Sequence, residues 1–364
     1  MNWLQRHRKD MQTFPRLRQL LYSGALSIKD LATGIVPYVG FPNNGNLGDE
    51  FLYRLAIQYL SPTNFEYNLA SRGRFLKASL LKTKGHYLVG GGSLIFGWDF
   101  LAKFQKLDDF GLAPVFWGTG SRDLSSDKDE QKVWANVLRR ARGCVRGELT
   151  AKSFRQLGLD VDVIGDMGFL VNLSFSNVCP PEKYILIIPR LVPERAPELH
   201  LLDLRRLDYL SDLIKKLCSQ GLKIIVYLPD INDRVSLAAW LAKLPASVLI
   251  QEYGGIDTGV SFLKLARSAK AVVSMRLHPG LFAYSLGVPT LFFESRAKYH
   301  DTFSVLPTKP TIIDADAISK FDFHKDVENL IVEPLDARAQ RFGDVKNIAL
   351  RQEKYSRDVL SILN

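Results

Sequence analysis

The chain has 364 residues, of which 46% are hydrophobic and 24% are charged. This length fits two domains better than one core, and the composition is that of a globular protein rather than a disordered one. The absence of any apolar run of about 18 residues excludes a membrane-spanning helix, and the formal net charge of +10 suits an anionic partner.

The N-terminal residues 1–30 form a basic extension that lacks the apolar core of a secretory signal. Two interpretations stay open: a peripheral contact with an anionic membrane surface, or a solvated extension that packs on the body. The cysteines Cys144, Cys179 and Cys218 are widely spaced and match neither a metal site nor a disulfide framework. We therefore expect a cytoplasmic protein, peripheral at the inner face of the membrane if the extension binds lipid. No nucleic-acid-binding module is found.

Strands and helices alternate along the first half of the chain. Apolar runs predict strands over 34–41, 86–92, 113–120, 143–148 and 160–166, with helices from about residue 48 and over 149–158. Residues 173–183 contain two prolines and no periodicity, which is typical of a linker. We expect an N-terminal domain over residues 31–175.

The same alternation restarts after the linker. It predicts strands over 184–190, 222–230, 247–253 and 271–274, and helices over 204–221, 234–244 and 258–268. We expect a C-terminal domain over 183–325 and a helical tail over 326–364 that crosses back to the first domain. The fold class is α/β, with two Rossmann-like lobes whose parallel sheets face each other across a cleft. Ligands of such sheets bind at the carboxyl ends of the strands.

Polar and glycine-rich segments follow several strands of the first lobe. Asn46, Gly48 and Asp49 follow the first strand, and the two amides and two glycines of this segment exceed what a turn and a helix cap require. Further candidates at strand ends are Gly91, Gly92, Ser93, Gly120, Arg146 and Asp166. Glycine amides and a hydroxyl group can bind an anion or a sugar, although their spacing matches neither a dinucleotide fingerprint nor a P-loop.

Cations end the strands of the second lobe. Arg190 ends the strand over 184–190, where it could bind an anion or form a structural ion pair. Arg276 and His278 lie between a strand and a helix start, which favours an anion, and arginine offers a planar fork for phosphate or carboxylate. Glu294 ends the next strand, and Lys298 follows it. The pattern predicts an anion clamp with an attached acid or base.

These segments in this order resemble the polysaccharide pyruvyl transferases. The resemblance rests on "NNGNLGDE", "VGGGSLI", "WGTGS", "VRGELT" with "GDMGFL", "ILIIPR" and "MRLHPGLFAYSLGVPTLFFESRAKYHDTF", and it spans roughly residues 35–305. It implies a GT-B-like fold and transfer of pyruvate from phosphoenolpyruvate to a sugar of a polysaccharide or its precursor, as a ketal, in exopolysaccharide or capsule biosynthesis. The chain departs from the family where Gly147 separates Arg146 from the acid Glu148.

The resemblance also implies roles for individual residues. Arg276 and His278 would hold phosphoenolpyruvate with Arg190, Lys298 and Arg146 nearby, and Asn46 and Asp49 would face the cleft. In the expected chemistry, His278 is the general acid and Asp49 or Asp166 takes the proton of the sugar hydroxyl. The glycines, Ser93 and Glu294 would line the acceptor side of the cleft. The expected partners are phosphoenolpyruvate and a saccharide or lipid-linked oligosaccharide, with no metal and no further cofactor.

Two other functions remain open. A GT-B glycosyltransferase that uses a nucleotide sugar would share the fold and the basic cleft, with Glu294 placed to bind a ribose. A non-catalytic protein that binds glycans or anions could use the same scaffold.

Overall fold

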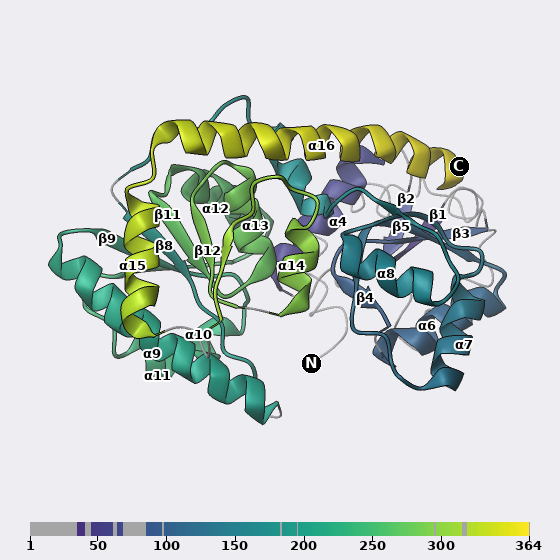
Figure 1. The fold of residues 1–364 in the computed structure, drawn as a ribbon, viewed down its shortest axis with the longest axis horizontal. Coiled ribbons are helices and arrows are strands. Elements are labelled where there is room, and N and C mark those ends of the chain that lie inside the picture. Colours follow the sequence, from purple (N-terminus) through teal and green to yellow (C-terminus); the bar gives the residue numbers. More distant parts are fainter. Residues whose placement is uncertain are drawn as a thin grey trace, which may run out of the picture.

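The computed structural model describes residues 35–40, 45–60, 64–67, 85–96, 98–182, 184–194, 196–294, 296–314 and 319–363. The basic extension that was expected over residues 1–30 lies outside these ranges. The described chain folds into two lobes, each built on one sheet (Figure 1). No helix among the described residues is long and apolar enough to cross a membrane.

The first lobe contains a sheet in the strand order β2-β1-β3-β5-β6-β7, and β4 pairs with β5. Its elements are β1 (Ile35–Val39), α4 (Leu47–Tyr59), β2 (Asn64–Tyr67), β3 (His86–Val89), β4 (Ser93–Ile95), α6 (Trp98–Asp109), β5 (Ala113–Ser121), α7 (Lys128–Leu138), β6 (Arg142–Val145), α8 (Glu148–Gln156), β7 (Asp162–Val163) and the 3-10 helix η1 (Met167–Ser174). All strand pairs of this sheet are parallel.

The second lobe contains a sheet in the strand order β10-β9-β8-β11-β12-β13, which is also parallel throughout. Its elements are β8 (Tyr184–Ile188), α9 (Pro197–Ser219), β9 (Lys223–Leu228), α10 (Asp233–Ser236), α11 (Ala238–Leu241), β10 (Leu249–Glu252), α12 (Ile256–Ser268), β11 (Ala271–Ser274), α13 (Leu277–Ser285), β12 (Thr290–Phe292), α14 (Ala297–Phe303), β13 (Thr311–Ile312), α15 (Lys320–Ile331) and α16 (Leu335–Leu363). The expected α/β class with two Rossmann-like lobes is confirmed.

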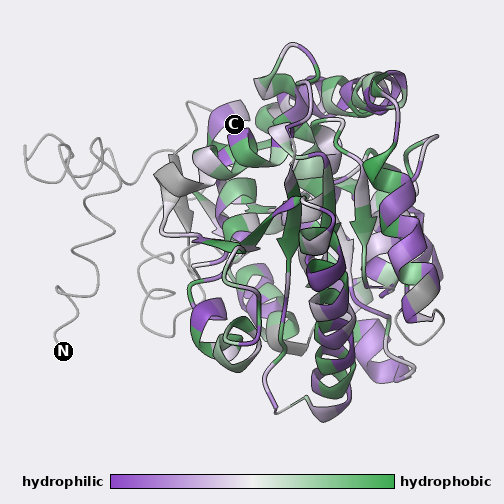
Figure 2. Cartoon of the chain, turned by 90° about the vertical axis from the view of Figure 1, so that its left-hand side faces the viewer, coloured by the Kyte–Doolittle hydropathy of each residue, from purple (hydrophilic) through white to green (hydrophobic). Residues whose placement is uncertain are grey.

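The composition of the central strands explains why they are covered on both faces. Every residue of β8 and β11 is buried, and their near-continuous apolar sequences are typical of parallel strands between two layers of helices. Figure 2 shows hydrophobic strands in the interior, whereas the helices around them carry both hydrophobic and hydrophilic residues. The helices therefore turn their apolar sides to the sheets.

A hydrophobic core also joins the lobes to each other. Helix α4 of the first lobe packs against α13 of the second, with the rings of Phe51 and Phe282 centred 5.4 Å apart. Backbone hydrogen bonds connect the same region, from the Leu47 nitrogen to the Pro229 oxygen and from the Ile231 nitrogen to the Gly45 oxygen. The start of α4 is thereby fixed to the end of β9.

Helix α16 spans both lobes and lies along one side of the molecule (Figure 1). At its beginning, Arg341 donates to the Gly287 oxygen of the second lobe. Near its end, Gln352 accepts from the Trp117 indole at 2.6 Å and donates to the Gly165 oxygen at 2.5 Å, both in the first lobe. The tail was expected to begin at residue 326, which falls within α15, a helix that packs on β11 and β12.

Two local expectations differ from the structure. The single helix expected over 234–244 is two short helices, α10 and α11, separated at the fully buried Leu237. The segment after β3, expected to be a glycine loop, contains the additional strand β4, which pairs with β5. In both places tertiary packing overrides the local sequence pattern.

We predict that Gln352→Leu destabilises the protein. Leucine has a similar size, but it leaves the buried Trp117 indole and the Gly165 carbonyl without a partner, at a cost of about 2–4 kcal/mol in the free energy of unfolding. Equilibrium unfolding in urea measures the change, with Lys354→Ala on the exposed side of α16 as the matched control. Equal stability of the two variants would show that these hydrogen bonds do not fasten α16 to the first lobe.

Candidate functional site

A cleft of about 600 Å³ lies between the carboxyl ends of the two sheets. Residues from both lobes line it: Asn46, Asp49, Gly92, Ser93, Ser121, Arg122, Asp123, Arg146, Arg190, Arg276, Leu277, His278, Pro279, Arg296, Ala297 and Lys298. Among these described residues, six are arginine or lysine and two are aspartate, so the cleft favours an anionic ligand.

Two buried carboxylates form ion pairs with Arg190. Its guanidinium group donates to Asp203 at 2.7 and 2.9 Å, and a third nitrogen lies 2.6 Å from Glu294. Burial alone would lower the pKa of Arg190, but these carboxylates raise it. Arg206, which is fully buried, contacts the same two acids. Arg190 therefore takes part in a structural ion-pair network while one side of it faces the cleft.

Arg276 precedes α13 and has a comparable partner. It forms an ion pair with Asp233 and donates to the Pro189 carbonyl at 3.4 Å. Burial raises the pKa of Asp233 to about 6, although Arg276 partly opposes this shift. The pair holds the guanidinium between the ends of β8 and β9, at the floor of the cleft.

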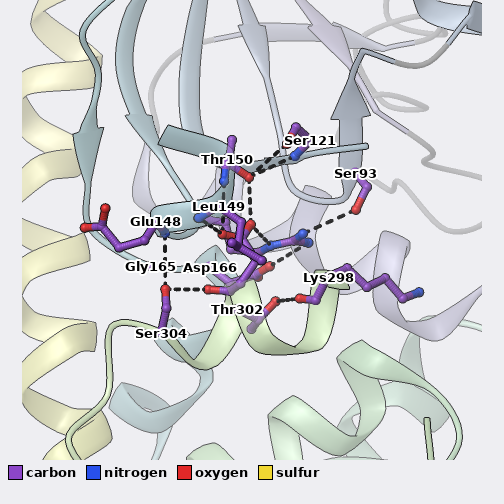
Figure 3. Close-up of polar contacts among 12 residues, drawn as sticks. Ser93, Ser121, Glu148, Leu149, Thr150, Gly165, Asp166, Lys298, Thr302 and Ser304 are labelled. Atoms are coloured by element: carbon purple, nitrogen blue, oxygen red, sulfur yellow. Dashed lines mark hydrogen bonds and ion pairs between the residues drawn. The ribbon is translucent and has the colours of Figure 1, made fainter. Parts of the chain in front are cut away.

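Arg146 comes from the end of β6 in the first lobe and is fully buried as a side chain. Its Nε lies 3.4 Å from Asp301 of α14, and its Nη2 donates to Ser93 at 3.3 Å. Its Nη1 lies 3.9 Å from Asp166 and has no hydrogen-bond partner. Figure 3 shows Ser93 and Asp166 on either side of these contacts.

Lys298 lies in α14, the helix that carries Asp301. Within the described residues its ammonium group forms no hydrogen bond or ion pair, and it lies 5.3 Å from the ring centre of Tyr299. Burial and the nearby Arg190 lower the pKa of Lys298 to about 8, and Glu294 offsets this only partly. Lys298 is thus a cation of the cleft that is not neutralised by a paired carboxylate.

His278 lies in the first turn of α13 and faces both lobes. Its Nε2 lies 3.8 Å from Asp166 and has no hydrogen-bond partner in the described residues. On the first lobe, a Cβ added at Gly48 would lie 2.6 Å from the Cβ of His278, so only glycine permits this approach. The stacked ring of Phe282 supports the imidazole from within α13.

The two candidate acids differ in their access to the cleft. Asp49 lines it, and burial raises the pKa of Asp49 despite the opposing charges of His278, Lys298 and Arg276. Asp166 is fully buried. Burial would raise the pKa of Asp166, but His278, Arg146 and the Gly168 amide together lower it. Asp49 is therefore placed to exchange a proton with a ligand, whereas Asp166 faces the side chains behind it.

A protein-family model for polysaccharide pyruvyl transferases matches residues 46–296. The matched region begins at the N-cap of α4 and ends at Arg296, and thus includes most of the cleft. The chain belongs to the polysaccharide pyruvyl transferase family. This confirms the resemblance found in the sequence motifs. No curated protein matches the chain in sequence.

Solved structures of low sequence identity share this fold. The Methanocaldococcus jannaschii UDP-GlcNAc 2-epimerase in complex with UDP-GlcNAc and UDP has a TM-score of 0.59 and 14% identity, covering 90% of this chain and 98% of that one. Anabaena Alr3699/HepE in complex with UDP and glucose has a TM-score of 0.56 and 12% identity, covering 91% and 99%. At these identities the likeness shows the GT-B fold alone.

The structure of this pyruvyl transferase family member brings most of the predicted site residues to the cleft. Those that line it are Asn46, Asp49, Gly92, Ser93, Arg146, Arg190, Arg276, His278 and Lys298. Asn46 also caps α4 through the Gly48 amide at 3.0 Å and donates to Asp230 across the lobes. It therefore has a structural role that the sequence did not suggest.

Five predicted residues do not line the cleft: Gly48, Gly91, Gly120, Asp166 and Glu294. A Cβ at Gly91 would meet Leu52, and one at Gly120 would meet Arg146, so these glycines allow side chains to pack rather than a ligand to approach. Glu294 is buried among Arg190, Arg206 and Arg296. A carboxylate held in this way is not available to bind a ribose.

Several contributors were not predicted from the sequence. Ser121 ends β5, Arg122 and Asp123 follow it, and all three line the cleft. Their position at a strand end was a signal that could have identified them. The partner acids Asp203 and Asp301 lie within helices, and no local pattern distinguishes them from exposed helical acids.

We predict that Lys298→Met stabilises the fold at neutral pH. The pKa of Lys298 is lowered from 10.5 to about 8, so folding of the charged form is disfavoured by on the order of 1 kcal/mol after allowance for partial solvent screening. The gain of the variant should be largest below pH 8 and should decline as the pH rises toward 10.5, because wild-type Lys298 then loses its proton on folding. Urea unfolding between pH 7 and 9.5 measures this.

The matched control for this experiment is Lys346→Met on the exposed side of α16, which should stay within about 0.5 kcal/mol of the wild type. A Lys298→Met protein that is less stable than the wild type at pH 7 would contradict the description of Lys298 as an unpaired cation.

Proposed function

We propose that the protein transfers pyruvate from phosphoenolpyruvate to a saccharide, or to the saccharide of a lipid-linked precursor, as a ketal, and releases phosphate. The observation that carries the proposal is the unpaired Lys298 beside Arg146, Arg190 and Arg276, with Asp49 and His278 in the same cleft. Family membership supports pyruvyl transfer, and the fold is one used by sugar-modifying enzymes.

The cations of the cleft suit the two anionic groups of phosphoenolpyruvate. The buried partner acids fix the guanidinium planes of Arg276 and Arg146, which can then receive a carboxylate or phosphate without reorganising. Among the described residues Lys298 adds a charge that forms no ion pair with a carboxylate. A doubly anionic donor would satisfy this excess of positive charge better than a neutral sugar would.

The proton transfers of ketal formation can be assigned to two groups. His278 protonates the methylene carbon C3 of the donor, which leaves an oxocarbenium-like centre at C2. A sugar hydroxyl bonds to C2 as its proton passes to Asp49. A second hydroxyl later bonds to C2 and gives its proton to His278, while the phosphate leaves with the electron pair of the C2–O bond and takes the proton held by Asp49. Asp166 is buried behind His278, so we assign it to orienting the imidazole rather than to contact with substrate.

The acceptor is placed on the side of the cleft formed by the first lobe. Ser93, Ser121 and Asp123 line that side, and hydroxyl and carboxylate groups bind sugar hydroxyls by hydrogen bonds. Two of the structures that share the fold are complexes with UDP-GlcNAc and UDP or with UDP and glucose. A nucleotide sugar is therefore the competitor against which phosphoenolpyruvate is tested.

We predict that phosphoenolpyruvate raises the melting temperature. A ligand at 100 times its dissociation constant stabilises the native state by about 2.7 kcal/mol. Thermal unfolding is measured with millimolar phosphoenolpyruvate, phosphate, pyruvate or UDP. The largest shift is expected with phosphoenolpyruvate, because it alone combines both anionic groups of the proposed donor. A shift with UDP and none with phosphoenolpyruvate would instead support a glycosyltransferase.

We predict that His278→Gln lowers turnover by roughly 100-fold while changing the affinity for phosphoenolpyruvate far less. Glutamine keeps a hydrogen-bond donor but has no proton to give to the donor carbon, so the chemical step should be slowed while the donor site stays intact. Phosphate release with a panel of free and lipid-linked saccharides provides the assay.

The control for the acid role is His300→Gln, since His300 is exposed on α14 and does not line the cleft; its turnover should match the wild type. Near-normal turnover of His278→Gln would remove His278 from the proton transfer.

A further inference from the structure

Asp301 makes an unusual set of contacts across the two lobes. It lies in α14 of the second lobe, and its carboxylate accepts hydrogen bonds from the Leu149 amide at 2.9 Å, the Thr150 amide at 3.2 Å and the Thr150 hydroxyl at 2.6 Å. These donors form the first turn of α8 in the first lobe. Figure 3 shows Thr150 and Glu148 of α8 opposite α14, which Ser304 follows as the C-cap. Asp301 thus caps a helix of the other lobe.

The sequence of α8 makes room for this cap. The N-cap residue Gly147 offers no side-chain hydrogen bond. A Cβ at this position would lie 2.0 Å from the Asp301 carbonyl oxygen and 2.4 Å from its carboxylate. Because Gly147 supplies no cap, the carboxylate at this helix start comes from Asp301 in the second lobe.

The same carboxylate holds Arg146. Asp301 Oδ2 lies 3.4 Å from Arg146 Nε, and the guanidinium continues to Ser93 through Nη2 at 3.3 Å. With two of its three nitrogens held, the remaining Nη1 is directed toward Asp166 and the cleft. Asp301 therefore determines the plane in which Arg146 presents its unpaired nitrogen.

Helix α14 also carries the unpaired cation of the cleft. Lys298 precedes Asp301 by one turn, and its carbonyl accepts from the Thr302 hydroxyl at 2.8 Å. One carboxylate thus ties the helix that bears Lys298 to the strand that bears Arg146. We infer that Asp301 is a positioning residue that sets the spacing of Arg146 and Lys298, so that cations from both lobes act on one doubly anionic donor. The identity of that donor rests on the proposed function.

A double-mutant cycle tests this inference. Arg146→Lys, Asp301→Asn and the double variant are compared with the wild type in kcat/KM for phosphoenolpyruvate. We expect Asp301→Asn to lower kcat/KM roughly tenfold or more, mainly through KM, because the donor site is misaligned. Once Arg146 is replaced, Asp301→Asn should cost little more, because it acts through that arginine.

Ser304→Ala is the matched control. Ser304 accepts from the Glu148 amide at 3.2 Å at the same junction but does not contact Arg146. It should lower the melting temperature slightly and leave kcat/KM unchanged. Amide hydrogen exchange provides a readout without ligand: Leu149 and Thr150 should exchange faster in Asp301→Asn and remain protected in Arg146→Lys.

The outcomes separate this inference from the proposed function. If the wild type neither binds nor turns over phosphoenolpyruvate, the proposed function fails and the role toward that donor fails with it, while hydrogen exchange still decides the cap. An active wild type whose two losses multiply in the double variant would show that Asp301 does not act through Arg146. Unchanged exchange of Leu149 and Thr150 in Asp301→Asn would overturn the interlobe cap.

Discussion

The cleft depends on buried carboxylates that stand behind its arginines. Asp203 and Glu294 form ion pairs with Arg190, and Asp233 forms one with Arg276. These buried acids thereby fix the orientation of the arginines that face the ligand. Isolated buried charges are costly, and a charge that loses its partner destabilises a fold strongly. The acids therefore let the protein keep several cations close together. Among the described residues Lys298 has no such partner, so its charge adds to what the paired arginines offer a ligand.

The general plan of the site could be predicted from the sequence because it follows from topology. Parallel strands all end at one edge of a sheet, and the two sheets were expected to face each other across a cleft. Residues such as Arg146 of the first lobe and Arg276 of the second were therefore expected to meet. The motifs, in the order in which they occur along the chain, also indicated the protein family. The alternation of apolar runs was sufficient to predict two lobes and most of their strands.

Other features could not be predicted, because they depend on which way a side chain points and on what lies behind it. Asp166 and Asp49 both follow strands, yet only Asp49 lines the cleft. Gly91 resembles a ligand-binding glycine in sequence, but the nearby Leu52 explains it. Asp301 lies within an ordinary helix, and its importance depends on a contact with residues about 150 positions away. Such pairings follow from the packing of the lobes and leave no local pattern.

The path of α16 affects the order in which the two lobes can fold while the chain is being synthesised. The indole of Trp117 and the carbonyl of Gly165 belong to the first lobe, but their partner Gln352 lies in the second half of α16. A nascent chain that has just completed the first sheet therefore still exposes polar groups that are buried in the final protein. Domains generally fold in turn as they leave the ribosome. Here we expect the first lobe to acquire its native packing last, after the whole second lobe has been made.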